Sequence, residues 1–360
     1  MTKEVFQSRL DRLAHLMGVE RKTLPLDMQA AMGQIPCAET SDPEKLCASP
    51  LVSVSIVTYN HEPWIAQAIE SVLTQECDFA FELVLAEDCS TDRTREICLD
   101  YQRRYPHIIR VLHSGTNLGS AKNMCRAWIR LRGEYVCPFE GDDYWTDRRK
   151  LQKQVALLRK HPDANLCVGF VKILHGGATE PAARRKPPRA KERLTFRDLS
   201  ADPLTYHTST RMFTRAGLQR ICAAGSPVVL VDTPILLIAS HYGAVVQLPE
   251  YLSVYRRSGL GICSGAGQLA RVRLFMRVAV SLASFFYPAH RYHITQRLYK
   301  VVIDFLCMGG NGLSRAEQRE ALGLALSLVG VPAHRIWPTF RLAFKCLMPC
   351  RATRQGDGEE

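Results

Sequence analysis

The sequence predicts an α/β protein whose main domain is a Rossmann-like, doubly wound and mostly parallel sheet, with an appended C-terminal helical region. Between residues 51 and 139, β-branched or apolar runs alternate with stretches whose apolar residues recur at helical spacing. Short links separate them, which is typical of strand–helix–strand units in parallel sheets. A chain of 360 residues with 46% hydrophobic residues is long enough for such a domain and an extension.

The elements of this domain follow in order along the chain. Four strands are expected, over residues 51–58, 82–86, 108–112 and 134–139. Three helices separate them, with apolar stripes within residues 64–73, 97–105 and 121–131. A further helix is expected near the amino end, where one stripe contains Phe6, Leu10, Leu13, Ala14 and Met17. This helix would pack on the main domain or on a partner.

An acidic run, Glu140-Gly141-Asp142-Asp143, follows the fourth predicted strand. Packed carboxylates repel one another and take up protons, whereas a bound divalent cation keeps all of them ionised. Oxygen ligands suit Mg²⁺ or Mn²⁺, which retain positions for water and substrate phosphates. The run therefore predicts a metal site that also binds a diphosphate, with a solvated acidic turn as the alternative.

Three polar clusters fall at the carboxyl ends of the predicted strands, where doubly wound sheets bind ligands. They cover residues 58–63, 87–94 and 117–123. Helix capping explains Ser90 or Asp92 as well as ligand contact does, and turn chemistry alone explains Asn117 and Gly119. Asp88 precedes the cap without a local partner, so its carboxylate is suited to accept the ring N–H of a pyrimidine.

Six ordered motifs within residues 57–154 resemble the family 2 glycosyltransferases of GT-A fold. They are Val57-Thr58-Tyr59-Asn60 with Trp64, Ser71-Val72-Leu73-Thr74-Gln75, Glu87 to Thr94, Asn117-Leu118-Gly119, Asp142-Asp143-Tyr144-Trp145, and Lys150-Leu151-Gln152-Lys153-Gln154. The resemblance covers residues 51–261, with a nucleotide-sugar half (51–150) and an acceptor half (151–261). An N-terminal helical extension (1–50) and a basic helical region (262–360) lie outside it.

The resemblance implies roles for individual residues. The nucleoside would be cradled by Thr58, Tyr59, Asn60, Glu62 and Asp88, with Asp88 facing a uracil-like edge and Lys122 near the ribose or phosphate. Glu140 and Asp142 look like the acidic pair of the family's metal motif, with Asp143 adjacent. The cofactor implied is a divalent metal, Mn²⁺ or Mg²⁺, bridging the two phosphates of the donor.

The acceptor half is represented by Val231-Asp232-Thr233-Pro234, which resembles the segment that carries the family's general base. A single in-line displacement with inversion needs one carboxylate within reach of the acceptor hydroxyl. Asp232 is also suited to cap a helix, with Pro234 in the first turn. Its position after the metal motif and before Tyr255-Arg256 favours the role of base.

The segment Val254-Tyr255-Arg256-Arg257-Ser258 departs from the pattern, because relatives often have a histidine near the phosphates where this chain has Ser258. Either Arg256 and Arg257 neutralise the diphosphate, which guanidinium groups suit, or the site is weakened.

Taken as a whole, the resemblance implies transfer of a single sugar, with UDP favoured through Asp88, to a hydroxyl of a glycan or lipid-linked acceptor. The alternatives are a non-catalytic sugar-nucleotide-binding protein and a membrane-surface adaptor.

Composition bears on compartment and partners. A cytoplasmic protein is predicted, with the inner face of the membrane as an alternative, because the thirteen cysteines are scattered without a CxxC pair and the amino end has no apolar core.

The net charge of +12 is concentrated in a loop at 184–191 and near residues 335–354, where basic and apolar residues interleave. This tail fits an amphipathic helix on an anionic membrane or ordinary core packing. No nucleic-acid module accompanies the basic patches, so no nucleic-acid partner is expected. The oligomeric state is not predicted.

Overall fold

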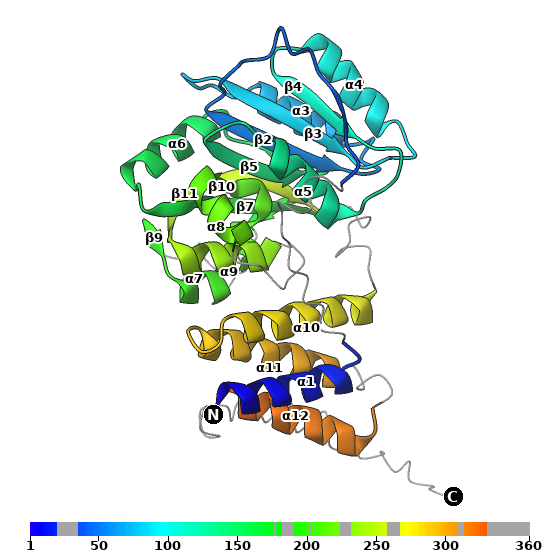
Figure 1. Ribbon diagram of the computed structural model, residues 1–360, viewed down its shortest axis with the longest axis vertical. Coiled ribbons are helices and arrows are strands. Elements are labelled where there is room, and N and C mark those ends of the chain that lie inside the picture. The colour runs from blue at the N-terminus through cyan, green and yellow to red at the C-terminus, as the bar shows by residue number, and fades with distance from the viewer. Residues whose placement is uncertain are drawn as a thin grey trace, which may run out of the picture. The chain divides into compact units, whose positions relative to one another are not determined.

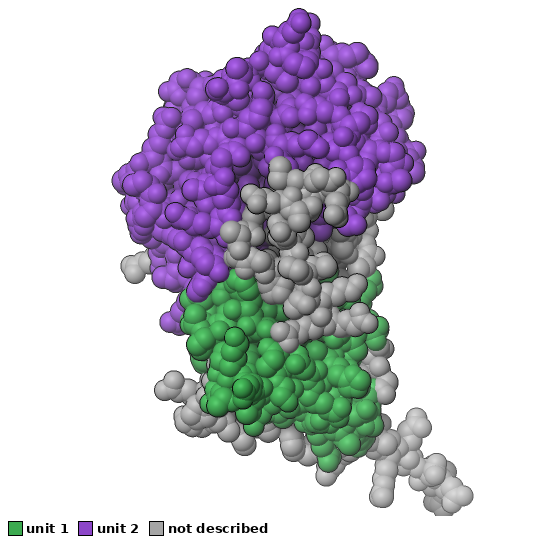
Figure 2. All heavy atoms as spheres, viewed as in Figure 1, with its two compact units in different colours: residues 1–22, 266–360 green, residues 23–265 purple. Residues whose placement is uncertain are grey.

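A computed structural model of the chain describes residues 1–19, 35–175, 178–181, 191–201, 203–223, 232–257, 267–307 and 313–329. The chain divides into two compact units (Figure 2). One unit is residues 23–265, and the other combines residues 1–22 with residues 266–360.

The larger unit is built on a sheet in the order β1-β4-β3-β2-β5-β10-β7-β11-β6 (Figure 1). Its first half is parallel, with β2 between β3 and β5, and β4 on the far side of β3. These four strands are β2 (Val52–Thr58), β3 (Phe81–Glu87), β4 (Ile109–His113) and β5 (Tyr135–Glu140). The short strand β1 (Ala38–Thr40) extends this half by antiparallel pairing with β4.

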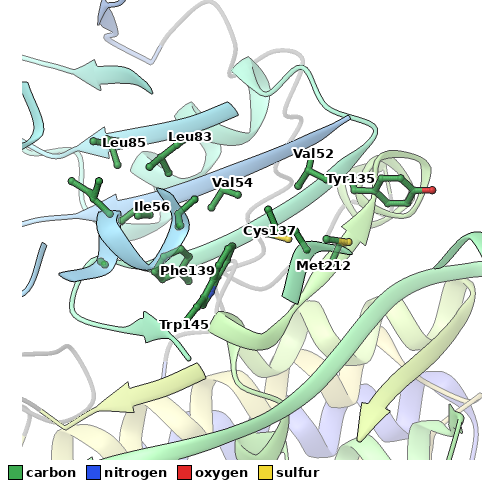
Figure 3. Close-up of a cluster of buried hydrophobic side chains, with 14 of the residues drawn as sticks. Val52, Val54, Ile56, Leu83, Leu85, Tyr135, Cys137, Phe139, Trp145 and Met212 are labelled. Carbon is green, nitrogen blue, oxygen red and sulfur yellow. The ribbon is translucent and has the colours of Figure 1, made fainter. Parts of the chain in front are cut away.

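Three helices connect the parallel strands: α3 (Ile65–Leu73), α4 (Thr94–Arg104) and α5 (Ser120–Arg130). Alternate residues of β2, which are Val52, Val54 and Ile56, form one buried apolar cluster with side chains of α3, α4 and the neighbouring strands (Figure 3). Both faces of β2 are buried, as expected for a central parallel strand. The predicted α/β fold is confirmed, and each of the four predicted strands agrees with an observed strand to within a residue at either end.

The second half of the sheet is mixed. Strand β10 (Met212–Thr214) runs antiparallel to both β5 and β7 (Ala164–His175), whereas β11 (Ala244–Arg256) runs parallel to β7. Three short strands add to β7 or β11, namely β6 (Tyr144–Trp145), β8 (Ala178–Pro181) and β9 (Arg193–Leu194). The helical segments of this half are α6 (Lys150–Lys160), α7 (Phe196–Ala201), η1 (Pro203–Tyr206), η2 (Thr208–Thr210), α8 (Arg215–Ala223) and α9 (Asp232–Tyr242).

The smaller unit is helical, and contains α1 (Lys3–Leu16), α10 (Gln268–Phe285), α11 (Arg291–Cys307) and α12 (Arg315–Val329). The predicted stripe on α1 is buried, and α1 packs against α10 and α12 of the same unit. Arg12 forms an ion pair with Glu320, and Ser284 donates a hydrogen bond to Gln7. A helix close to the amino end thus completes a bundle formed by the other end of the chain.

Candidate nucleotide and metal site

The carboxyl ends of β2, β3 and β5 meet at one edge of the sheet. Parallel pairing places Thr58 beside Glu87, and Val57 beside Glu140. The loops that follow these strands carry most of the residues predicted to bind a nucleotide or a metal. Folding therefore brings the first two polar clusters and the acidic run together, as expected for ligand binding at this edge.

The loops after β2 and β3 are held together by reciprocal hydrogen bonds. Asn60, whose φ is 54°, accepts the Thr91 N–H at its side-chain oxygen (2.9 Å). Glu62 accepts the Arg93 N–H (3.0 Å), while its own N–H donates to Asp92 (3.1 Å). The side chains of Asn60 and Glu62 therefore shape the loop, and their contact with a nucleoside stays a prediction.

Two loops approach each other closely at Gly141. A Cβ atom at this glycine would lie 2.8 Å from the Thr58 hydroxyl oxygen and 2.9 Å from His61 Nδ1. Thr58 and His61 are themselves within hydrogen-bonding distance (3.2 Å). Burial lowers the pKa of His61, although the negative charges of Asp142 and Asp92 oppose this shift. The glycine thus allows the acidic run to lie against the loop that follows β2. The negative charge of Asp142 there opposes the lowering of the His61 pKa.

Asp88 lies at the end of β3 and is buried. Its two carboxylate oxygens accept the backbone N–H groups of Leu118 and Gly119, both at 2.9 Å. These bonds hold the third polar cluster, and Gly119, with a φ of 80°, precedes α5. An ionised carboxylate can accept about four hydrogen bonds, so capacity for the N–H of a base remains. A uracil contact of Asp88 stays a prediction.

Lys122 lies in the first turn of α5, next to this cluster. The start of α5 is fixed to the end of β3, because Asn123 donates to the Ala86 carbonyl (2.8 Å) and Arg126 donates to the Glu87 carbonyl (2.7 Å). Tyr59, by contrast, is 42% exposed. An exposed aromatic ring and a lysine at the rim of the loops are suited to contact a base and a phosphate.

Residues of α3 and of the segment after it hold the chain that follows the acidic run. Ser71 accepts the Trp145 N–H (3.1 Å), and Gln75 donates to the Asp147 carbonyl (2.8 Å) while accepting the Leu151 N–H (3.1 Å). The serine and glutamine of the predicted Ser-Val-Leu-x-Gln motif therefore position the chain that follows the carboxylates.

The two aspartates of the run have different neighbours. Asp142 is 8% exposed and interacts electrostatically with His61, whereas Asp143 is 1% exposed. One oxygen of Asp143 accepts the Arg256 N–H (2.9 Å), and the other lies 3.4 Å from His207 Nδ1. Adjacent residues of one loop thus contribute carboxylates both to the loop after β2 and to the second, mixed half of the sheet.

His207 also lies at this site, although its sequence context predicts no role for it. Ligand atoms of Glu140, Asp143 and His207 all lie within 4.8 Å of one another. His207 precedes η2, and the chain reaches the acidic run because β10, which follows η2, pairs with β5. A histidine before a short polar run gave no signal on its own, since only this strand pairing brings it close to Glu140.

The donor set fits a divalent cation such as Mn²⁺. Two carboxylates and one imidazole are ligands that transition metals of borderline character accept, and all three are buried or half-buried. Within the described residues Glu140, Asp143 and His207 are the side chains grouped closely enough to bind one ion. Asp142, predicted as a ligand, lies next to this group in the same loop.

Arg256 supports the acidic run. Its guanidinium donates to the Asp142 carbonyl (2.9 Å) and to Gln67 (2.7 Å), and it lies 5.9 Å from the ring centre of Trp64 and 5.5 Å from that of Tyr144. A role of Arg256 in neutralising a diphosphate stays a prediction. α9 begins at Asp232, but the side chain of Asp232 is not described, so its roles as base and as cap both stay predictions. Ser258, the loop at 184–190 and the basic tail lie outside the described residues.

The sequence matches a family model described as glycosyl transferase family 2 over residues 53–222. The match includes the three loops and His207, and it ends before Asp232 and Arg256. The uncharacterized protein Rv1520 of Mycobacterium tuberculosis is 32% identical over 219 residues, which are 60% of this chain and 61% of that protein. The chain therefore matches less than two thirds of the length of this relative.

Two solved structures share the fold. TarS of S. aureus, residues 1–349 with UDP-GlcNAc, is 20% identical with a TM-score of 0.56, over 82% of this chain and 87% of that chain. A mannosyltransferase from Pyrobaculum calidifontis, solved with GDP-Man and Mn²⁺, has a TM-score of 0.50 over 95% of this chain and 97% of that chain. Among the described residues, no helix is long and apolar enough to cross a membrane.

Proposed function

We propose that the chain, whose residues 53–222 match the model of glycosyl transferase family 2, transfers one sugar from a nucleotide-sugar donor to a hydroxyl of a glycan or lipid-linked acceptor. The observation that carries the proposal is the meeting of three strand ends, with Asp88, Asp142 and Asp143 on adjacent loops. These loops offer Tyr59 and Asp88 for contact with a base, and the carboxylates of the acidic run for a metal–diphosphate.

The residues have the following roles in the proposed reaction. Tyr59 and Asp88 bind the base, and Lys122 contacts the ribose or phosphate. Glu140, Asp142 and Asp143 hold a divalent metal, which when bound offsets the charge of the departing diphosphate. Arg256 keeps the acidic run in position through the Asp142 carbonyl.

Asp232 is proposed as the general base. Its carboxylate takes the proton of the acceptor hydroxyl while that oxygen attacks the anomeric carbon of the donor sugar, on the face opposite the diphosphate. The bond from the anomeric carbon to the diphosphate breaks in the same step, and the configuration at that carbon is inverted. The nucleoside diphosphate leaves with the electron pair of the broken bond.

Release of nucleoside diphosphate from a panel of donors tests the function. The panel contains UDP-, dTDP- and GDP-sugars, each with Mn²⁺, with Mg²⁺ and with chelator. Metal-dependent release from one donor, with slow hydrolysis replacing transfer when no acceptor is added, is the expected result. Metal-dependent binding of UDP without release from any donor would favour the sugar-nucleotide-binding alternative, and absence of binding would contradict the nucleotide site.

A second candidate role, contact with an anionic membrane, is supported by the distribution of charge. Residues 1–22 and 266–360 contain 18 of the 47 lysines and arginines but only 9 of the 35 acidic residues. This unit therefore carries +9 of the net charge of +12. Clustered basic residues attract anionic lipid, and the attraction weakens as salt is raised.

Sedimentation with liposomes tests this contact. The full chain should sediment with vesicles that contain phosphatidylglycerol at low salt, less at high salt, and not with neutral phosphatidylcholine vesicles. Equal recovery with both vesicle types would contradict an electrostatic contact. A chain that ends at residue 332 would show whether the basic tail contributes.

A further inference from the structure

We propose that His207 is a direct ligand of the metal at this site, and that its imidazole makes the site prefer Mn²⁺ to Mg²⁺. The inference rests on the proposed function only in that a metal is needed there. It assigns the metal a ligand from the acceptor half of the domain, outside the acidic run.

The geometry already approaches that of a coordination site. Ligands bound at about 2.1 Å lie about 3 Å apart when adjacent and about 4.2 Å apart when opposite in an octahedron. His207 Nδ1 and Asp143 Oδ2 are separated by 3.4 Å, and the group with Glu140 is contained within 4.8 Å. Small side-chain movements are therefore enough for one ion to contact all three.

The imidazole is held in place before any metal binds. His207 is 6% exposed, and its ring stacks on Tyr255 with the ring centres 4.4 Å apart. Nδ1 accepts the Ser209 N–H (3.4 Å) and lies 3.0 Å from the Ser209 hydroxyl, which in turn lies 2.9 Å from the hydroxyl of Ser253. A ring fixed in this way loses little conformational freedom on binding a metal. Coordination through Nδ1 would replace the long hydrogen bond that this nitrogen accepts from the Ser209 N–H.

The chemistry of the three donors decides the preferred metal. Mg²⁺ favours oxygen ligands and loses its waters reluctantly, whereas transition metals accept imidazole readily. A site with only carboxylates would discriminate weakly between Mg²⁺ and Mn²⁺. Replacing one oxygen ligand by a nitrogen should therefore strengthen binding of Mn²⁺ more than binding of Mg²⁺.

The proposal is tested first by spectroscopy on the unmodified full chain. Mn²⁺ is added with UDP, and electron spin echo envelope modulation is recorded, since a directly bonded imidazole couples its ¹⁴N nucleus to the metal. A ¹⁴N coupling is expected in the wild type. Bound Mn²⁺ without such a coupling would overturn the proposal, whatever the result of the sugar-transfer assay.

The second test compares two histidine variants. His207→Asn should weaken Mn²⁺ binding, titrated by electron paramagnetic resonance, by at least about tenfold, and abolish the ¹⁴N coupling. Mg²⁺ binding, measured by competition, should change much less, because the asparagine oxygen is a suitable ligand for it. His161→Gln is the matched control, a half-buried histidine paired with Glu192 outside the site, and should bind both metals normally. Equal weakening of both metals, or of neither, would contradict His207 as the selective ligand.

Discussion

Asparagine in place of Asp142 is expected to lower the rate of sugar transfer by about 100- to 1,000-fold, the cost of removing one group that stabilises the charge of a transition state. Asp142 follows β5, is 8% exposed, and interacts electrostatically with His61 in the loop after β2. Its carboxylate is therefore the one of the acidic run placed on the nucleotide side. Without it, the metal and the diphosphate lose a charged contact.

This variant separates chemistry from folding. The contact that Arg256 makes to Asp142 uses the backbone carbonyl, which asparagine keeps. The melting temperature without ligand should therefore match that of the wild type, while the rise in melting temperature on adding UDP with Mn²⁺ should shrink. Asp147→Asn, which removes a carboxylate paired with Lys153 just beyond the site, serves as the control and should transfer at nearly the wild-type rate. An Asp142→Asn protein with full activity would exclude Asp142 from the metal–diphosphate site.

The parallel half of the fold could be predicted because its signals are local. The β-branched run of β2 and the apolar stripe of α3 are buried, and each pattern lies within a single element. Hydrophobic periodicity along the sequence is therefore enough to predict them. The short strands could not be predicted in this way. β1 has three exposed or half-buried residues, and it is a strand because it pairs with β4 and because Glu39 binds Arg110 with both oxygens.

The residues of the candidate site also differ in whether their position depends on local sequence or on long-range strand pairing. Asp88, Asp142 and Asp143 could be predicted to lie at one edge, because each comes within four residues of the end of a predicted strand and parallel strands end at the same edge. His207 could not, because its proximity to Glu140 depends on the antiparallel pairing of β10 with β5. Asn60 and Glu62 show the reverse case, since residues in a binding motif also hold the loop together through bonds that sequence does not reveal.

Replacing Asp232 by asparagine is expected to lower the rate of transfer by about 100- to 10,000-fold, the usual contribution of a general base. Two roles compete at this residue, because α9 begins at Asp232 and aspartate is also a good helix cap. Asparagine caps helices as well as aspartate but does not take up a proton at neutral pH. The Asn variant therefore removes the proposed base and keeps a side chain that can cap the helix.

The readouts of Asp232→Asn should differ from those of Asp142→Asn. Binding of UDP with Mn²⁺ should be unchanged, because the proposed base acts on the acceptor hydroxyl and not on the diphosphate, so the loss should appear only in the rate of transfer. Asp232→Ala is the comparison that removes the cap as well, and it should also lower the free energy of unfolding by about 0.5–2 kcal/mol. If Asp232→Asn transferred sugar at the wild-type rate and only Asp232→Ala were impaired, in proportion to its lost stability, Asp232 would be a cap and the proton acceptor would have to be another group.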